Sequence, residues 1–196
     1  MRSEAPPLLP IFRSRHQAEL LAWLLLHPDQ EFGLTELAQR LDVPLTTLQR
    51  EAQRLIEADL LQARTQGRNR LVRANPANRA TAPVRQLLEP SLGPLAVIGE
   101  ELALPRVECV VIFGSWADRY QGQPGPPPND IDVLVIGDPL RAEVYDAADR
   151  AQTRLGLPIN PILRTSEQWA TNNDPLVEQV RHSPNVAVFE ANGEQT

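Results

Sequence analysis

The sequence predicts a two-domain protein of mixed class, with an N-terminal α+β module and a C-terminal α/β module built on a small mixed sheet. The chain has 196 residues, 42% of them apolar and 22% charged, which suits two small globular domains. Its charge is uneven, because residues 1–93 hold 12 Arg and 10 acidic residues whereas residues 94–196 hold 7 Arg and 15 acidic residues. Helices and a hairpin precede the proline-rich segment 74–105, and strands alternating with helices follow it.

The first elements are helices. Residues 14–27 are densely apolar and stop before a proline, which predicts a buried helix. A short extended segment at 31–33 comes next, and then a helix that we expect Thr35 to cap. Pro44 suits the first position of a further helix, which we expect to run to about Ala58.

This last helix has an apolar stripe and a cationic face, and a basic hairpin follows it. Predicted strands at 60–63 and 69–73 flank a tip that carries Arg64, Arg68 and Arg70. Between Arg40 and Arg85 there are 9 Arg and 4 acidic residues, a basic zone in a protein of net charge -6. Two helices, a short turn and a basic hairpin predict a winged helix-turn-helix over residues 14–75 that binds double-stranded DNA. The expected DNA contacts are Thr46, Thr47, Gln49, Arg50, Arg54, Arg68 and Arg70.

Residues 76–93 contain several prolines and are predicted to form a linker before a second domain over 94–191. In that domain we expect helices at 95–102, 141–155 and 166–181, a short helix from Gly114, strands at 107–113, 130–137, 159–163 and 186–190, and a Pro/Gly loop at 122–129.

Two carboxylates begin one of these strands. Asp130 and Asp132 stand at i and i+2, so their side chains project from the same face of the strand and can hold one metal ion. Mg²⁺ prefers one or two carboxylates together with phosphate oxygens. Gly114 and Ser115, at the end of the preceding strand, allow close backbone approach and supply a hydroxyl for a phosphate group. This order of motifs predicts a nucleotide or metal site.

Two stretches carry a family resemblance. Phe113-Gly-Ser-Trp-Ala, together with Asn129-Asp-Ile-Asp-Val-Leu-Val, resembles the motif of the minimal nucleotidyltransferases, and residues 36–73 resemble winged-helix regulators of the ArsR type. The combined order is similar to bacterial proteins that fuse both modules. The resemblance implies ATP or another NTP as donor, Mg²⁺ held by Asp130 and Asp132, and Ser115 on a terminal phosphate. Some relatives are antitoxins that adenylylate a HEPN-type partner toxin.

Two departures from the family pattern bear on catalysis. Fourteen residues separate Ser115 from Asp130, more than is usual in the family. The position of the third carboxylate, which such enzymes use as general base, matches Asn160. An amide can ligate a metal or a sugar but cannot take up a proton at neutral pH. Two of the three expected carboxylates are present, so the sequence alone does not decide whether the protein is an enzyme.

Other residues have alternative interpretations. Arg119 can reach a nucleotide phosphate or form an ion pair with Asp118 or Glu101, and Trp116 can stack on a base or pack between strand and helix. The only cysteine, Cys109, alternates within an apolar strand, as a core residue does. The three histidines lack the spacing of a zinc site.

Three functions fit these observations. The first is a cytoplasmic DNA-binding homodimer, a transcriptional regulator or antitoxin-like protein whose second domain binds a Mg-nucleotide. The second is an active NMP transferase, an adenylyltransferase, that modifies a protein partner such as a HEPN-type toxin. The third is an interaction scaffold in which both sites are vestigial. Residues 1–10 lack the apolar core of a signal peptide, and no segment predicts a membrane span.

Overall fold

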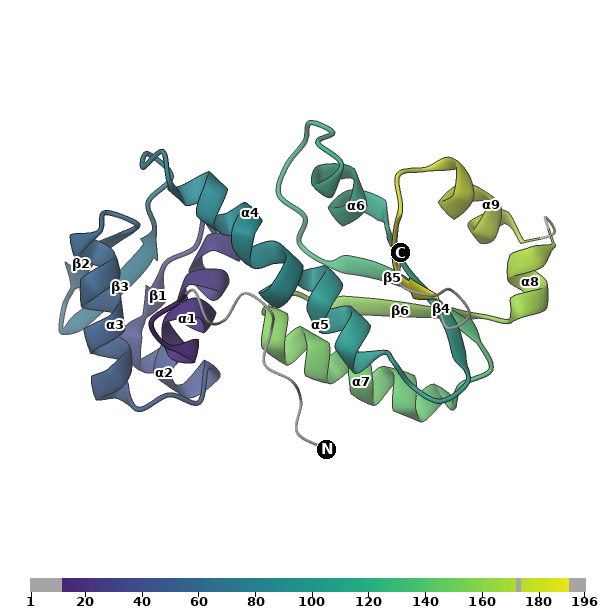
Figure 1. Cartoon of the computed structure of the whole chain (residues 1–196), viewed down its shortest axis with the longest axis horizontal. Coiled ribbons are helices and arrows are strands. Elements are labelled where there is room, and N and C mark those ends of the chain that lie inside the picture. Colours follow the sequence, from purple (N-terminus) through teal and green to yellow (C-terminus); the bar gives the residue numbers. More distant parts are fainter. Residues whose placement is uncertain (1–11, 172–173, 191–196) are drawn as a thin grey trace. The chain divides into compact units, whose positions relative to one another are not determined.

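The computed structural model describes residues 12–171 and 174–190 and shows a mixed α/β protein (Figure 1). The chain divides into two compact units, Met1–Pro94 and Leu95–Thr196, here the N-terminal and C-terminal units. The expectation for residues 1–10 and the predicted domain end at 191 lie outside the described residues. Among the helices of the described ranges, none combines the length and the apolar character needed to span a bilayer.

The N-terminal unit contains a three-stranded antiparallel sheet of order β1-β3-β2 and four helices of the described chain. In chain order its elements are α1 (Arg15–Leu26), β1 (Phe32–Gly33), α2 (Leu34–Arg40), α3 (Leu45–Glu57), β2 (Leu61–Gln66), β3 (Asn69–Ala74) and α4 (Thr81–Leu92). The predicted order of the first three helices is confirmed, but Thr35 is not a cap, because α2 begins at Leu34 after Gly33. Pro44 likewise precedes α3 as its N-cap instead of opening it.

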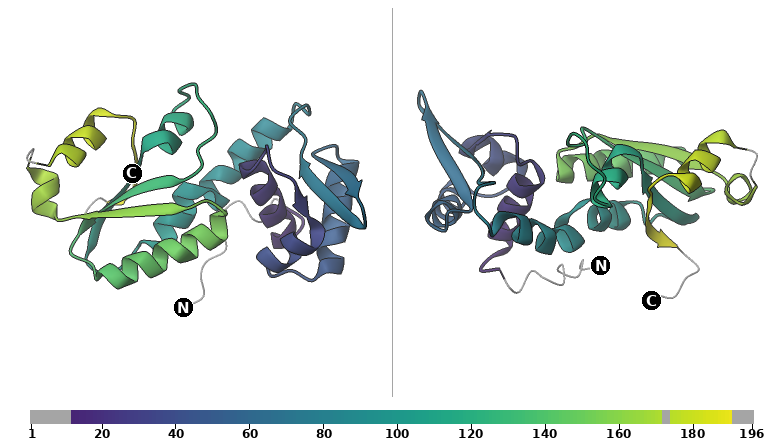
Figure 2. Two further views of the ribbon diagram at one scale, coloured as in Figure 1. Left: turned by 180° about the vertical axis from the view of Figure 1, so that it is seen from behind. Right: turned by 90° about the horizontal axis from the view of Figure 1, so that it is seen from above.

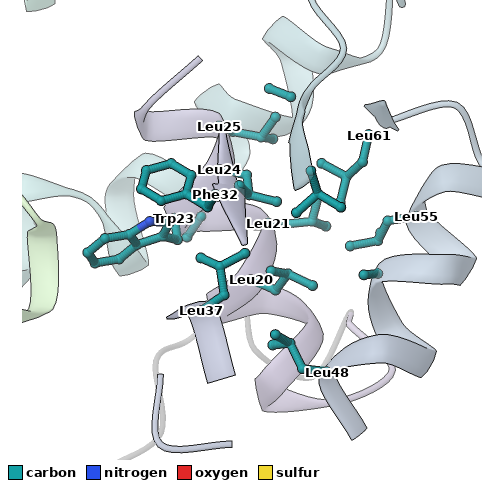
Figure 3. Packing of buried hydrophobic residues seen from close by; sticks show 14 of the residues in the cluster. Leu20, Leu21, Trp23, Leu24, Leu25, Phe32, Leu37, Leu48, Leu55 and Leu61 are labelled. Atoms are coloured by element: carbon teal, nitrogen blue, oxygen red, sulfur yellow. The ribbon is translucent and has the colours of Figure 1, made fainter. Parts of the chain in front are cut away.

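Helix α1 is the centre of the N-terminal core. Its leucines meet Leu48 and Leu55 of α3 and Leu61 of β2, as Figure 3 shows. The predicted linker 76–93 contains helix α4, whose Leu88 is buried in the same core. Burial of an apolar residue on the inner face of an amphipathic helix stabilises the packing of that helix. Most of the expected linker is therefore a helix of the N-terminal unit.

The β2–β3 hairpin is longer than the sequence predicts. The strands pair from Leu61↔Ala74 to Gln66↔Asn69, which leaves a two-residue turn at Gly67 and Arg68. Gly67 has φ +62°, and glycine at the first central position suits such a tight turn. In the right-hand view of Figure 2 the hairpin extends outward beyond the helices of its unit. Arg64 therefore lies within β2 and not at the tip.

The C-terminal unit contains a four-stranded mixed sheet of order β6-β5-β4-β7, in which only β5 and β6 are parallel among the described pairs. Its elements are α5 (Pro94–Glu101), β4 (Val107–Phe113), α6 (Gly114–Tyr120), β5 (Ile131–Gly137), α7 (Arg141–Leu155), β6 (Ile159–Arg164), α8 (Ser166–Ala170), α9 (Pro175–His182) and β7 (Val186–Glu190). The small mixed sheet expected from the sequence is confirmed.

Each face of this sheet carries its own apolar cluster. Helices α5 and α7 cover one face (Figure 1), where Ile98 and Val144 belong to the same apolar cluster as Val133 and Val135. Val180 of α9 packs on the other face against Leu134. Because residues alternate between faces along a strand, consecutive apolar residues of β5 belong to different clusters.

The single helix predicted over 166–181 is wrong, because the described residues there form two helices. Asp174 caps α9 by accepting hydrogen bonds from the backbone N–H groups of Leu176 and Val177, and Pro175 occupies the first turn. Proline favours this position, since its missing N–H would have no intrahelical partner there.

Candidate functional site

Three polar residues, Asp130 just before β5, Asp132 of β5 and Asn160 of β6, meet at one end of the sheet in the C-terminal unit. Asp132 of β5 stands opposite Phe113 of β4 in the antiparallel register and opposite Asn160 of β6 in the parallel register. Further along β5, Leu134 lies in the apolar cluster under α9, and its side chain shares the face of Asp132. The polar residues therefore continue that face beyond its apolar part.

Asn160 links the two aspartates. Its Nδ2 donates to Asp130 Oδ2 at 2.9 Å and to Asp132 Oδ1 at 3.2 Å. One amide nitrogen thus contacts both carboxylates, which shows that the two acidic side chains approach one point, as their i and i+2 spacing predicts. All three residues retain solvent contact.

Gly114 approaches the same carboxylate from β4. It has φ +72°, a left-handed conformation that glycine adopts without strain. A Cβ atom at this position would lie 2.7 Å from Asp132 Oδ2, so only glycine leaves the carboxylate in its present place. This is the close backbone approach that the sequence suggested for Gly114.

Helix α6 follows directly and carries the remaining predicted residues. Ser115 is exposed in its first turn, next to Gly114. Arg119 lies one turn later and is half-buried, with Nη2 3.6 Å from Asp118 Oδ2. Trp116 is buried in the apolar cluster of the α5 and α7 face and stacks on Tyr120 at 5.0 Å between ring centroids. Packing between strand and helix is therefore what the structure shows for Trp116.

The residues present fit a hard divalent cation bound with a phosphate ligand. The two converging carboxylates match the one or two carboxylates that Mg²⁺ usually takes from a protein. Over the ranges 12–171 and 174–190, no cluster of three or more His, Cys, Asp or Glu side chains forms a complete metal site. Phosphate oxygens and water would have to supply the other ligands. The amide of Asn160 is neutral, so it leaves both negative charges of the aspartates uncompensated.

In the N-terminal unit, α3 presents a polar face opposite its buried leucines. Thr46, Gln49 and Arg50 are exposed, whereas Leu48 and Leu55 are buried. Thr46, Gln49, Arg50 and Gln53 recur at i, i+3, i+4 and i+7, which places them on one face of the helix. Thr47 borders this face and is half-buried.

The hairpin joins this face. Arg70 of β3 donates from Nη2 to Gln53 Oε1 of α3 at 2.8 Å, so the hairpin and the helix present neighbouring side chains. Arg68 is exposed in the turn. We call Thr46, Gln49, Arg50, Gln53, Arg68 and Arg70 the cationic face.

The sequence suggested that Arg54 contacts DNA, but in the structure Arg54 does not join the cationic face. It donates from Nη1 to Glu51 Oε1 at 2.7 Å, and Glu51 is only 6% exposed. Gln17 of α1 donates to the other carboxylate oxygen of Glu51 at 3.3 Å. Sequence reasoning missed this acid, although Glu51 follows Leu48 by three residues and so falls within the stripe that faces the core.

Arg64 is also engaged within the N-terminal unit. It donates to both carboxylate oxygens of Glu31, and these hydrogen bonds hold the pKa of Glu31 below its ordinary value. A bidentate pair keeps a guanidinium in a fixed orientation. Of the three arginines expected at the hairpin tip, Arg68 and Arg70 remain on the cationic face.

Comparison with known proteins gives limited similarity. No protein-family model and no curated protein sequence matches the chain. Among solved structures, the chain is similar to reduced HlyU from Vibrio cholerae N16961, at 21% identity and TM-score 0.33, over 42% of this chain and 78% of that chain. It is also similar to a mutant of the toxin-antitoxin pair MntA-HpeT, at 14% identity and TM-score 0.33, over 49% of this chain and 69% of that chain.

Proposed function

We propose that the protein is a DNA-binding regulator, of the transcriptional or antitoxin-like type, whose N-terminal unit is a winged helix-turn-helix and whose C-terminal unit binds a Mg-nucleotide. The observation that carries the DNA-binding function is the hydrogen bond between Arg70 and Gln53, because it joins the hairpin to the exposed face of α3. A helix face of this kind fits the major groove of duplex DNA, and a neighbouring basic hairpin adds phosphate contacts. We further propose that the protein is cytoplasmic. We also propose that it forms a homodimer, because a dimer with two-fold symmetry matches a duplex site of the same symmetry.

DNA titration at several salt concentrations tests this function. Fluorescence anisotropy with a labelled duplex should show tight binding whose log-log salt slope falls by about 0.9 for each phosphate contact removed. We expect weaker binding from Arg50→Ala and from the double variant Arg68→Ala with Arg70→Ala. Arg85→Ala is the matched control, because Arg85 lies on α4 and pairs with Glu89. Wild-type affinity in the first two variants would rule out the cationic face.

The C-terminal unit is proposed to bind ATP or another NTP with Mg²⁺ held by Asp130 and Asp132. The contact of one amide nitrogen with both carboxylates supports this proposal, since it shows that the two side chains reach a common ligand. Bound Mg²⁺ would neutralise phosphate charge and polarise the phosphate groups. Gly114 leaves room beside Asp132, and Ser115 and Arg119 offer donors to phosphate oxygens. The amide of Asn160 can bind the metal or a sugar hydroxyl.

Isothermal calorimetry with ATP, GTP, CTP and UTP, with and without Mg²⁺, tests the nucleotide site. The double variant Asp130→Asn with Asp132→Asn should lose Mg-dependent binding. Asp138→Asn serves as control, because Asp138 follows the far end of β5 and is paired with Arg106. Binding by the double variant at wild-type affinity would show that the metal site is wrongly assigned.

An active NMP transferase is the second candidate, favoured by the same pair of carboxylates. In that reaction an acceptor hydroxyl oxygen bonds to the α-phosphorus, the bond to the β-phosphate breaks, pyrophosphate leaves and the hydroxyl proton passes to a base. Asn160 cannot accept that proton, and general-base catalysis typically contributes about 10²- to 10⁴-fold. We therefore propose weak transfer at most.

Radiolabelled NTP incorporation, into the protein itself or a HEPN-type partner, separates the two candidates. Transfer by the wild type that disappears with Asp130→Asn and Asp132→Asn would establish the enzyme. If the protein binds nucleotide but does not transfer it, Asn160→Asp should change nucleotide affinity without creating transfer.

A further inference from the structure

We propose that Arg119, beneath the loop 121–129, is the anchor for a polyphosphate anion, and that the loop lifts from its guanidinium when the anion binds. Its identification with the phosphate tail of the nucleotide rests on the nucleotide site proposed above.

The guanidinium of Arg119 is poorly satisfied within the chain. Its Nε and Nη1 atoms are buried, and the described residues supply neither with a hydrogen-bond acceptor. Its contact to Asp118 Oδ2 from Nη2 is 3.6 Å long, beyond an ordinary hydrogen bond. Buried donors are almost always paired, and an oxyanion would supply the acceptors.

The position of Arg119 relates it to the aspartate pair. Arg119 follows Ser115 by four residues on α6, so the two side chains share one face of the helix. Side chains on a helix lean toward its N-terminus, which directs Arg119 toward Ser115. Gly114, the residue before Ser115, lies against Asp132. An anion held by Arg119 would therefore extend along α6 toward the carboxylates.

The loop 121–129 covers the guanidinium. A Cβ atom on Gly125 would lie 1.6 Å from Arg119 Nη1, so this glycine packs directly against the charged group. The start of the loop is tied to α6, since Gly122 donates to the Arg119 carbonyl and Gln123 to the Asp118 carbonyl. Pro126, Pro127 and Pro128 have no N–H to donate, so this part of the loop can leave the guanidinium without losing backbone hydrogen bonds from those positions.

This arrangement explains the extra loop length. The segment between Ser115 and Asp130 both shields Arg119 and leads into the aspartate pair. The loop and an anion compete for the same guanidinium edge. A polyphosphate has many oxygens and a high charge. Its hydrogen bonds to Arg119 therefore best offset the contacts that are lost when the loop is displaced.

Calorimetry with sodium tripolyphosphate in EDTA tests the proposal without base, sugar or metal. We expect the wild type to bind, Arg119→Gln to bind at least about tenfold more weakly, and Arg106→Gln to be unchanged. Arg106 is the matched control because it is exposed and precedes β4, whose other end leads to α6. Gly125→Ala should bind more tightly than wild type, because a methyl group prevents the loop from packing on the guanidinium. Circular dichroism would verify folding of each variant.

The outcomes separate this proposal from the nucleotide site. In EDTA the double variant Asp130→Asn with Asp132→Asn should bind tripolyphosphate at least as tightly as wild type, since like charge has been removed. If the double aspartate variant retains Mg-ATP binding while Arg119→Gln loses tripolyphosphate binding, the role of Arg119 as anchor is supported and the proposed metal site is ruled out. Competition by ATP in EDTA would identify the anchor with the phosphate tail. Absence of wild-type binding, or equal affinity in Arg119→Gln, overturns the anchor.

Discussion

Asn160 stands directly opposite Asp132 in the parallel register of β6 and β5 and donates its side-chain amide to that carboxylate. The same nitrogen also donates to Asp130. A neutral donor thus occupies the position where the family resemblance leads one to expect a third acid. Residue 160 therefore decides whether this site holds two acidic side chains or three.

Asn160→Asp should make the C-terminal unit depend on a divalent cation. The variant loses both hydrogen bonds and places a third negative charge beside two others, so in EDTA the free energy of unfolding should fall by about 1 kcal/mol or more. Mg²⁺ should restore more stability to the variant than to wild type, since ligand binding to the folded state stabilises it. Urea unfolding with and without Mg²⁺ measures both effects. Asn160→Ala, which loses the hydrogen bonds but adds no charge, is the control, and identical responses of the two variants would contradict the expectation.

Gly114→Ala should abolish Mg-nucleotide binding. Alanine at φ +72° costs about 1 kcal/mol of stability, and its Cβ atom would displace the Asp132 carboxylate. Gly67→Ala is a matched control, because Gly67 has φ +62° and no atom lies within 4 Å of the place that an added methyl group would take. Both variants should lose similar stability in thermal unfolding. Calorimetry should show that only Gly114→Ala loses nucleotide binding. Retained binding in Gly114→Ala would show that the close approach of Gly114 to Asp132 is not needed for the site.

Glu51→Gln should strengthen DNA binding by releasing Arg54. Glu51 holds the Arg54 guanidinium at 2.7 Å, so removing its charge leaves Arg54 available to a phosphate. The log-log salt slope should then steepen by about 0.9, the contribution of one phosphate contact. Glu57→Gln removes an exposed charge from the same helix without touching Arg54, and Glu57 accepts only from Gln53 among the hydrogen bonds described for its side chain. Equal salt slopes in the two variants would show that Arg54 has no such role.

Asp174→Asn should remove a pH-dependent part of the stability. The hydrogen bond from Arg164 holds the pKa of Asp174 below its ordinary value of 3.8, so the folded state favours the ionised form. This stabilisation is complete above the unfolded pKa and is lost as the pH falls through the folded value. Asparagine still caps a helix, so the substitution isolates the charge. The wild type should melt higher than the variant at pH 7, and the difference should vanish near the acid end of a pH series. A difference that persists there would point to the cap instead.

Local pattern in the sequence predicted most of the elements and their order. The predicted bounds of β4 and α7 agree with Val107–Phe113 and Arg141–Leu155, because apolar alternation and helical spacing are properties of neighbouring residues. The pairing of Asp130 with Asp132 on one strand face could be predicted for the same reason. The division of 166–181 into two helices was missed, although Pro175 carried the signal.

Only the tertiary structure decided which partner each polar side chain takes. Asn160 is 28 residues from Asp132 and meets it through the register of two strands, which no local pattern specifies. Arg54 and Arg64 look equivalent to Arg50 in the sequence, yet acids on α3 itself and before β1 engage them. Arg119 is distinguished by the loop that folds over it. For Asn160 and Arg64 the physical reason is the same: a polar or charged side chain can reach several partners, and the packing of distant segments selects one of them.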